Sequence, residues 1–379
     1  MKLAFCILKY FPYGGLQRDF MLIAEECRAR GHQIAVYTLS WDGPVPEAFD
    51  VRLIRSSAFT NSGNARNFSL GVLEKLEQAP VDGIIGFNPM PGLDVYFAGD
   101  VCFVEKARRK HSWLYRLGPR FRTFSALEKG VFAPEAAAAI IYLTERQKQG
   151  YISCYGTPAD RFRLLPPGIS PDRQRPDDAA AVRAAMRESF KLAPEDLALI
   201  QVCSSFATKG VARSIEALAS LPEPLRARTH YWVVGNDSPG RFASLAQSYG
   251  LGGNVVFTGA RDDVSALLLG ADLMIHPAVT EAAGTVLVEA MAAGLPILCS
   301  DACGYASYIS KASAGRVVPE PFEQAALNRE LLELLSNADL PALGQNARRF
   351  ASAESFHRRS QCAADIIETV VSRKRQCSI

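Results

Sequence analysis

The sequence predicts an α/β protein of two doubly wound, Rossmann-like domains that face each other across a cleft. Short apolar runs alternate along the chain with segments whose apolar residues recur at three- and four-residue steps. Such alternation of strands and helices is typical of parallel sheets that are covered by helices on both faces. A chain of 379 residues is also too long for one ordinary core.

Each expected strand is a short, continuous apolar run, which is the pattern of a strand buried on both faces. The expected strands are residues 3–8, 34–39, 83–87, 138–143, 197–203, 231–234, 255–257, 273–276 and 296–300. Between them lie amphipathic segments such as residues 17–29 and 214–219, which we expect to be helices.

A linker is expected at Pro166-Pro167-Gly168, because prolines end helices and cannot donate to a strand ladder. We therefore place an N-terminal domain at residues 1–167 and a C-terminal domain at residues 168–354. An amphipathic helix over residues 355–379 is expected to pack back on the first domain.

Composition excludes several classes of protein. Apolar residues make up 48% of the chain, which indicates a globular protein, and a net charge of +3 gives no reason to expect a nucleic-acid partner. No run of about 18 apolar residues predicts a membrane span. Lys9 interrupts the apolar N-terminus, which favours a first strand over a signal peptide. Nine scattered cysteines without a C-x-x-C pair are typical of free thiols in the cytoplasm.

The strongest motif covers residues 276–290. We expect a strand to end at His276, a loop to present Glu281, and a helix to begin near Gly284. The unpaired N–H groups and the positive dipole at a helix start suit a phosphate. Glu289 would lie about 7 Å further along the helix axis, so that the two carboxylates could hold hydroxyls on opposite sides of a diphosphate. The alternative is an acidic helix start with a solvated glutamate.

A second motif places a cation at the start of another helix. Lys209 ends the segment Ser204-Ser205-Phe206-Ala207-Thr208-Lys209 after an expected strand, where the next helix starts. A cation at a helix N-terminus opposes the dipole at a cost of about 0.3–1 kcal/mol, and a bound anion would reverse the sign of that term. The alternative is a lysine without a role.

Three weaker candidates complete the expected donor site. Gly14 and Gly15 permit close backbone contact, although the G-x-G-x-x-G fingerprint of a dinucleotide site is missing and a tight turn is the alternative. Arg173, after the linker, could form bidentate contacts with a diphosphate or be a solvated hinge residue. Arg261 could flank a nucleobase, although the sequence favours no role for it. The expected donor-binding residues are Gly15, Arg173, Lys209, Arg261, Glu281, Ala282, Ala283, Gly284, Thr285, Val286 and Glu289.

No metal site is expected. The five histidines are dispersed and Asp262-Asp263 lacks the context of a metal-binding pair. Lys209, Arg173 and helix dipoles would then neutralise a leaving diphosphate.

The segment over residues 103–132 concentrates positive charge beside an apolar stripe of Trp113, Leu117, Phe121 and Phe124. Gly118-Pro119 is expected to split the segment into two short helices. Basic and aromatic residues together suit an interfacial helix on anionic lipids, here the inner leaflet of the cytoplasmic membrane. The alternative is that the aromatics pack on the first domain and the cations face water. The expected membrane-binding residues are Lys106, Arg108, Arg109, Lys110, Trp113, Arg116, Arg120 and Arg122.

Together, Glu281 and Glu289 with Lys209 resemble the retaining GT-B glycosyltransferases, whose signature is two glutamates separated by seven residues. The stretches 10–20 and 86–96 are further similar to lipopolysaccharide core hexosyltransferases. The resemblance implies a UDP-sugar donor, with UDP-glucose first, and the heptose of a lipid-anchored lipopolysaccharide inner core as acceptor. It also implies retention at the anomeric carbon and no cofactor beyond the donor.

The resemblance implies a role for each residue. Glu281 would hold the transferred hexose, Glu289 the ribose, and Lys209 with Arg173 the diphosphate. Asp19 and Asp100 would face the acceptor or the sugar. Thr208 departs from the pattern, because relatives commonly carry an arginine there, which leaves the diphosphate one cation short.

Rival classes are weaker. A nucleotide-sugar epimerase can share this architecture, another UDP-hexose or glycan acceptor is possible for a transferase, and a non-catalytic membrane scaffold would not need Glu281, Glu289 and Lys209.

Overall fold

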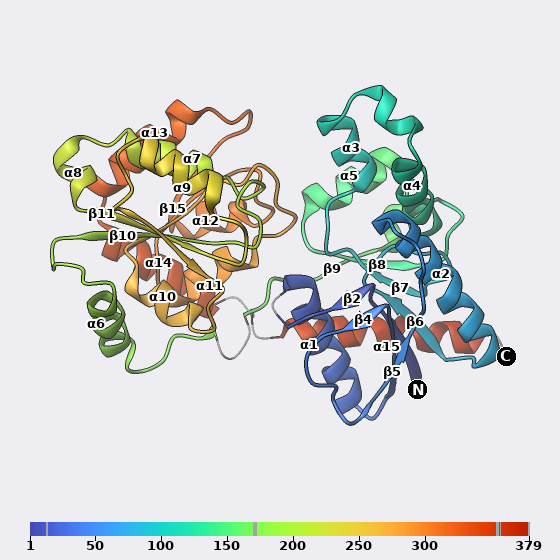
Figure 1. The fold of residues 1–379 in the computed structure, drawn as a ribbon. Helices are drawn as coiled ribbons and strands as arrows, with labels where there is room; N and C mark the ends of the chain where they lie inside the picture. The colour runs from blue at the N-terminus through green and yellow to red at the C-terminus, as the bar shows by residue number, and fades with distance from the viewer. Residues whose placement is uncertain (13, 170–172, 354–355, 357, 378–379) are drawn as a thin grey trace. The chain divides into compact units, whose positions relative to one another are not determined.

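The chain forms two compact units in the computed structural model, which describes residues 1–12, 14–169, 173–353, 356 and 358–377 (Figure 1). The N-terminal unit comprises Met1–Pro166 with Arg358–Ile379, and the C-terminal unit comprises Pro167–His357. The chain therefore passes between the units twice. The first passage follows Pro166, one residue before the predicted end of the N-terminal domain at residue 167. The second passage precedes Arg358, and the C-terminal unit thus ends three residues after its predicted end at residue 354. Tyr13, residues 170–172 just after the predicted linker, residue 354, and residues 355, 357, 378 and 379 of the predicted last helix lie outside the described residues.

The N-terminal unit is built on a seven-stranded parallel sheet in the order β5-β3-β1-β6-β7-β8-β9. The strands are β1 (Lys2–Cys6), β3 (Gln33–Thr38), β5 (Phe49–Leu53), β6 (Gly83–Gly86), β7 (Val95–Phe97), β8 (Ala139–Tyr142) and β9 (Phe162–Leu164). Two further strands, β2 (Lys9–Tyr10) and β4 (Ser40–Trp41), pair with each other.

The helices of this unit include the last helix of the chain. They are α1 (Gly15–Ala29), α2 (Asn61–Gln78), α3 (Phe103–Lys110), α4 (Pro119–Phe132), α5 (Glu145–Tyr155) and α15 (Arg359–Cys377), with the 3₁₀ helices η1 (Trp113–Leu117) and η2 (Ala159–Arg161). Helix α15 packs against α1. Arg30 bridges to Asp365 at 2.7 Å and to Glu368 at 2.9 Å, and Lys374 bridges to Asp94 at 2.8 Å. Ion pairs thus hold the middle and the C-terminal part of α15 against the rest of the N-terminal unit.

The C-terminal unit is built on a six-stranded parallel sheet in the order β12-β11-β10-β13-β14-β15. The strands are β10 (Leu197–Val202), β11 (Thr229–Val234), β12 (Val255–Gly259), β13 (Leu273–His276), β14 (Ile297–Ser300) and β15 (Gly315–Val318).

Helices cover both faces of this second sheet. Those of the unit are α6 (Ala179–Ser189), α7 (Val211–Ala219), α8 (Glu223–Ala227), α9 (Gly240–Ser248), α10 (Val264–Gly270), α11 (Thr285–Ala293), α12 (Ala306–Ala312), α13 (Gln324–Ser336) and α14 (Leu340–Ala353). Helices α7, α9 and α13 lie on one side of the sheet, and α10, α11 and α14 lie on the other (Figure 1).

The two sheets share one topology, which confirms the predicted fold class of doubly wound parallel sheets. In each, the strand order reverses beside the first strand, between β1 and β6 and between β10 and β13. Ligands of such sheets bind at the carboxyl ends of the strands that flank this reversal. The loops after β10 and β13 are the ones that carry Lys209 and Glu281.

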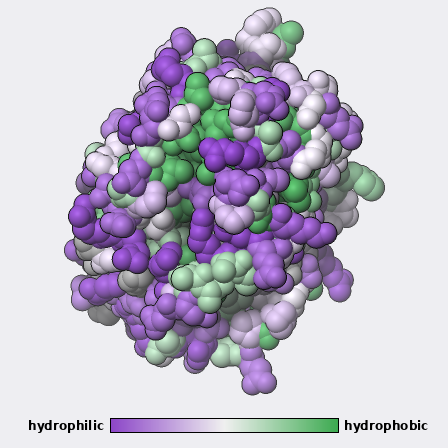
Figure 2. All heavy atoms as spheres, turned by 90° about the vertical axis from the view of Figure 1, so that its left-hand side faces the viewer, coloured by the Kyte–Doolittle hydropathy of each residue, from purple (hydrophilic) through white to green (hydrophobic). Residues whose placement is uncertain are grey.

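The surface gives two further observations. On the face drawn in Figure 2, which looks onto the C-terminal unit, hydrophilic residues interrupt the hydrophobic areas. Across the described residues, the structure contains no helix with both the length and the apolar character of a membrane span.

Candidate active site

The loops after β10 and β13 are fastened to each other. The amide of Val279 donates to the carbonyl of Thr208 at 2.9 Å. Gly210, with φ +77°, lies so close that a Cβ there would stand 2.1 Å from the carbonyl oxygen of Pro277. No other residue could adopt this conformation at this separation, so glycine is required for the contact. The two loops therefore hold each other in place.

Lys209 and Glu281 meet at this junction. Lys209 Nζ forms an ion pair with Glu281 Oε2, and both side chains are largely buried, with exposed fractions of 17% and 16%. Burial alone would raise the pKa of Glu281, but contact with His276 and the charge of Lys209 outweigh it and lower that pKa to about 2. The site thus holds a carboxylate and an ammonium group in contact, away from most solvent.

His276 is a part of this site that the sequence reasoning left out. Its ring is buried, with 1% exposed, and Nε2 lies 3.5 Å from Glu281 Oε2. The sequence interpretation made His276 a structural strand-end residue. The available signal was its position at the carboxyl end of β13, next to the strand-order reversal.

Helix α11 begins where the motif predicts, at Thr285, with Gly284 as its N-cap at φ +87°. The first N–H groups of a helix have no partner inside it, so those of Thr285 and Val286 point toward the loop that carries Glu281, Ala282 and Ala283. Glu289 is buried, with 4% exposed. This burial excludes the alternative of a solvated glutamate.

Two predicted donor residues of this unit, Arg173 and Arg261, and the position of Thr208 remain to be described. Thr208, the neutral residue before Lys209, accepts a hydrogen bond at Oγ1 from Ser205 Oγ at 3.1 Å. Arg173 follows the undescribed residues 170–172 and is partly buried. Arg261, after β12, is exposed, and its Nε donates to Asp263 Oδ1 at 2.7 Å.

In the N-terminal unit, two of the predicted residues start α1. Gly15 is its first residue, and a Cβ there would meet no atom within 4 Å, so open space adjoins this backbone. Asp19 is bound by Arg359, whose Nε and Nη2 donate to the two carboxylate oxygens at 2.9 and 2.8 Å. Arg359 Nη1 also donates to the carbonyl of Pro166 at 3.3 Å. Asp19 therefore joins the first helix to both passages of the chain.

Asp100 is fixed through its backbone. Its carbonyl accepts hydrogen bonds from Gln147 Nε2 at 2.5 Å and from the hydroxyl of Tyr151 at 3.0 Å. Gln147 and Tyr151 are both buried, so they hold the backbone of Asp100 in place. Asp100 as a residue is exposed to solvent.

The basic segment forms α3, η1 and α4. Its predicted split at Gly118-Pro119 is present, since η1 ends at Leu117 and α4 begins at Pro119, and a further break separates α3 from η1. Trp113 and Leu117 are 63% and 56% exposed. The rings of Phe121 and Phe124 instead lie 5.8 and 5.3 Å from that of Phe103. The predicted apolar stripe is thus divided between solvent and a local core.

The cations of this segment face solvent. Among the expected membrane-binding cations, those with exposed side chains are Lys106, Arg108, Arg109, Arg116, Arg120 and Arg122, and the side chain of Lys110 lies outside the description. None of the six forms an ion pair with a carboxylate of the described residues. Glu128, by contrast, is buried and accepts from the amide of Phe103 at 2.6 Å, which fixes α4 to the start of α3.

Metal ligands do not gather in the described part of the chain. No group of three His, Cys, Asp or Glu side chains there is arranged to hold an ion.

Two doubly wound parallel sheets, with the pair Lys209–Glu281 at the strand-order reversal of the second, define the class of GT-B glycosyltransferases. The family model "Glycosyl transferases group 1" matches residues 182–350. The model "Glycosyltransferase Family 4" matches residues 13–173. The two models fall on opposite sides of the first passage between the units, apart from the first residues of the C-terminal unit.

The chain belongs to the glycosyltransferase family that includes the lipopolysaccharide glucosyltransferase WaaG of Escherichia coli. The two are 45% identical over 368 residues, which cover 97% of this chain and 98% of the relative. The crystal structure of WaaG matches with a TM-score of 0.92 over 96% of this chain and 99% of that one. HepE of Anabaena, solved in complex with UDP-glucose, matches with a TM-score of 0.76 at 20% identity, which shows the shared fold alone.

Proposed function

We propose that this chain is a retaining, metal-independent hexosyltransferase that moves glucose from UDP-glucose to the heptose of the lipopolysaccharide inner core and so starts the outer core. The observation that carries the proposal is the buried pair of Lys209 and Glu281 at the strand-order reversal. The similarity to lipopolysaccharide glucosyltransferase WaaG supports the choice of donor and acceptor.

The pair places a positive and a negative side chain in contact, so that their charges offset each other. A nucleotide-sugar supplies a new partner for each member: the diphosphate for the ammonium group of Lys209, and hydroxyl groups of the hexose for the carboxylate of Glu281. Since the pKa of Glu281 is about 2, its carboxylate is ionised at neutral pH and accepts hydrogen bonds. Donor binding thus exchanges one set of charge contacts for another instead of leaving either charge bare.

The remaining roles follow the geometry of α11. Its start, from Gly284 to Val286, offers N–H groups and the positive end of the helix dipole to the diphosphate. Glu289, buried one turn further along, would hold the ribose. Arg173 would add a second cation, and Gly15 and Arg261 would contact the donor. Asp100 would face the acceptor, and Asp19, which is held by Arg359, would stabilise the start of α1 beside it.

Catalysis in this proposal rests on the leaving group. As the glycosidic bond breaks, charge grows on the diphosphate, and Lys209 with the start of α11 stabilises it without a metal ion. The acceptor hydroxyl attacks from the face that the diphosphate leaves, with no covalent intermediate, so that the anomeric configuration is retained.

The membrane side of the proposal rests on the basic segment. The protein would lie on the inner face of the cytoplasmic membrane, where its acceptor is anchored, with the unpaired cations of α3, η1 and α4 on anionic lipids. Exposed Trp113 and Leu117 would enter the interface beside them.

The experiment that tests the proposed function is a donor screen with the purified protein and a heptose-terminated core acceptor, run with and without EDTA. We expect transfer from UDP-glucose in preference to other UDP-hexoses, an α-linked product, and equal rates with the chelator. Transfer from another UDP-hexose alone would change the donor, and release of an epimerised nucleotide-sugar without transfer would refute the proposal. Activity that EDTA removes and Mg²⁺ restores would overturn its metal-free part.

A further inference from the structure

The loop that carries Glu281 has one fastening that the proposed roles leave unexplained. Residues 277 and 278 connect β13 to this loop and lie outside the paired strands. Ser300 Oγ donates to the carbonyl of Ala278 at 2.7 Å. A buried carbonyl without a partner is unfavourable, so other donors to this segment are expected.

Arg213 supplies those donors. It is the third residue of α7, which starts directly after Lys209 and Gly210. Its Nη1 donates to the carbonyls of Pro277 and Ala278, each at 3.1 Å. One guanidinium group therefore spans from the helix that follows Lys209 to the loop that precedes Glu281.

The guanidinium group is itself held in place. Its central carbon lies 3.6 Å from the centroid of the Phe322 ring, the distance of a stacked cation–π contact. Gln324 Nε2 donates to the backbone carbonyl of Arg213 at 2.9 Å. Burial lowers the pKa of Arg213, and the more distant charges of Glu320 and Glu216 act in the opposite direction. Within the described residues Arg213 forms no ion pair, so its donors serve the two carbonyls.

We infer that Arg213 is a positioning residue for sugar transfer: its guanidinium group sets the loop of Glu281 against the start of α7, so that the carboxylate and the ammonium group of Lys209 meet. This inference rests on the proposed function. Among the described residues, Arg213 forms no ion pair with Glu281, and its guanidinium group donates to the two carbonyls, which carry the effect.

Arginine suits this task, because its guanidinium group donates from Nη1 to both carbonyls while its planar face lies on the Phe322 ring. A lysine keeps the charge, but its ammonium group is a compact point charge on a flexible stem and cannot stack a planar face on the ring while it donates to the carbonyls. Arg213→Lys should therefore loosen the loop without introducing an uncompensated change of charge.

The loosening should affect the sugar more than the nucleotide. Glu281, on the loop, is proposed to hold the hexose, whereas Lys209 and Glu289 lie on other segments and are proposed to hold UDP. A residue that only stabilised the fold would lower the amount of active enzyme, and so kcat, without this selectivity.

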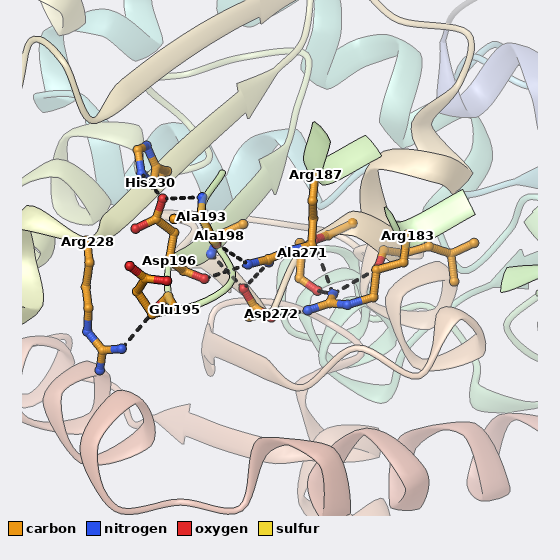
Figure 3. A network of polar contacts seen from close by, with 12 residues as sticks. Arg183, Arg187, Ala193, Glu195, Asp196, Ala198, Arg228, His230, Ala271 and Asp272 are labelled. Carbon is orange, nitrogen blue, oxygen red and sulfur yellow. Dashed lines mark hydrogen bonds and ion pairs between the residues drawn. The ribbon is translucent and has the colours of Figure 1, made fainter. Parts of the chain in front are cut away.

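The chain offers a matched control at the other end of the same strand. Arg183, on α6, donates from Nη1 to the carbonyls of Leu269, Gly270 and Ala271, which precede β13. Figure 3 shows Arg183 and Arg187 beside Asp272, with which both form ion pairs. Arg183 and Arg213 thus both bind backbone carbonyls, one before β13 and one after it.

The test compares Arg213→Lys, Arg183→Lys and wild type by calorimetry with UDP, calorimetry with UDP-glucose, steady-state kinetics and thermal unfolding. For Arg213→Lys we expect kcat/KM for UDP-glucose to fall about tenfold, through a raised KM, with UDP affinity within about twofold of wild type. For Arg183→Lys we expect a lower Tm with KM and UDP affinity unchanged. Phe322→Leu, which removes the stacked ring and keeps Arg213, should repeat the Arg213→Lys pattern at smaller size and carries the test if Arg213→Lys does not fold.

Two outcomes would overturn the inference. One is an Arg213→Lys or Phe322→Leu protein with the KM of wild type, and the other is an equal loss of UDP and UDP-glucose affinity. A wild-type protein that binds neither UDP nor UDP-glucose would instead refute the proposed function, and this inference with it.

Discussion

The two units of the chain have the same sheet topology but use the charges beside their strand-order reversals in different ways. In the C-terminal unit, Lys209 and Glu281 come from two strand-end loops and pair with each other across the reversal. In the N-terminal unit, Asp19 in the first turns of α1 is bound by Arg359, which also holds Pro166. The first pair joins two strand-end loops, and the second joins the first helix to the segments around Pro166 and Arg359.

The comparison shows that the role of an ion pair depends on whether a ligand could replace both of its charged partners. A diphosphate sugar could replace both partners of the Lys209–Glu281 pair, so this pair can open without leaving a bare charge. The bidentate contact between Asp19 and Arg359 has a buried arginine, 7% exposed, that tethers three segments. Opening it would leave that guanidinium group without its carboxylate, which is unfavourable in a buried setting.

The largest effect should follow removal of the cation in the C-terminal unit. Lys209→Ala should lower kcat about 10²–10³-fold, because the stabilisation of the departing diphosphate is lost. Lys148→Ala is the matched control, since Lys148 is a similarly buried lysine that pairs with Glu145 at 3.7 Å in the N-terminal unit. Steady-state kinetics on both variants would check this, and near-normal turnover of folded Lys209→Ala would remove Lys209 from the proposed mechanism.

The next largest effect concerns the surface of the N-terminal unit. The triple change of Arg116, Arg120 and Arg122 to glutamine should weaken binding to anionic liposomes about 100-fold, at about 1 kcal/mol for each cation. The control is the same change at Arg241, Arg316 and Arg329, three exposed arginines of the C-terminal unit. Flotation assays at two salt concentrations would measure both. Equal binding of wild type to neutral vesicles would favour the alternative of cations that simply face water.

Asp19→Asn tests the other side of the comparison. It should lower the free energy of unfolding by about 2 kcal/mol, because the buried guanidinium group of Arg359 loses its charged partner, and should leave UDP affinity unchanged. Asp50→Asn, at an exposed pair with Arg52, should change stability by less than about 1 kcal/mol. Urea unfolding and calorimetry would show this. Unchanged stability with a raised acceptor KM would make Asp19 an acceptor-binding residue instead.

The two glutamates of the C-terminal unit should differ in their effects on UDP. Glu289→Ala should weaken UDP binding about tenfold, through loss of a ribose hydrogen bond to a charged group. Glu281→Ala should leave UDP affinity within about twofold of wild type, since Glu281 is proposed to hold the hexose and UDP carries none. Calorimetry with UDP decides between them, and the reverse pattern would exchange their roles.

The smallest effect concerns acid stability. The folded-state pKa of Glu281, about 2, lies below its ordinary value of 4.5. Its carboxylate therefore stabilises the fold above pH 4.5, and this contribution declines as the pH falls toward 2. From about pH 5 to about pH 3.5, wild type should lose about 1 kcal/mol more unfolding free energy than Glu281→Gln. Parallel urea titrations of the two proteins would contradict this if their losses were equal.

The sequence predicted most of the interior strands and missed most of the edges. All nine expected strands coincide with observed ones, because buried parallel strands are continuous apolar runs. The short strands β2 and β4 and the three-residue interior strand β7 were missed, since so few residues make no recognisable apolar run. The missed strands β5, β9 and β15 each end a sheet and carry the charged residues Arg52, Arg163 and Arg316. A charged residue is tolerated where one side of a strand faces solvent, and it hides the strand from a search for apolar runs.

At the candidate site, the sequence identified what a motif places in one loop, namely Glu281, Glu289 and the start of α11. It also identified Lys209, since a cation at a helix start needs an explanation. It could not identify Arg213 or Arg359, because each depends on which segments the fold brings together. Such contacts join residues more than 60 or even 300 positions apart, as the bonds of Arg213 and Arg359 do.

The return of α15 to the N-terminal unit has a consequence for how the protein is made. Ala363, Ala364, Ile367 and Val371 of α15 are buried, and a Cβ on Gly83 in β6 would stand 2.3 Å from a methyl group of Val371. A ribosome synthesises β6 and α1 early, but the helix that covers them emerges last, after the whole C-terminal unit. The N-terminal unit is thus translated first but can be completed only after the C-terminal unit has been synthesised. Until then, the apolar surface that α15 covers stays exposed to solvent.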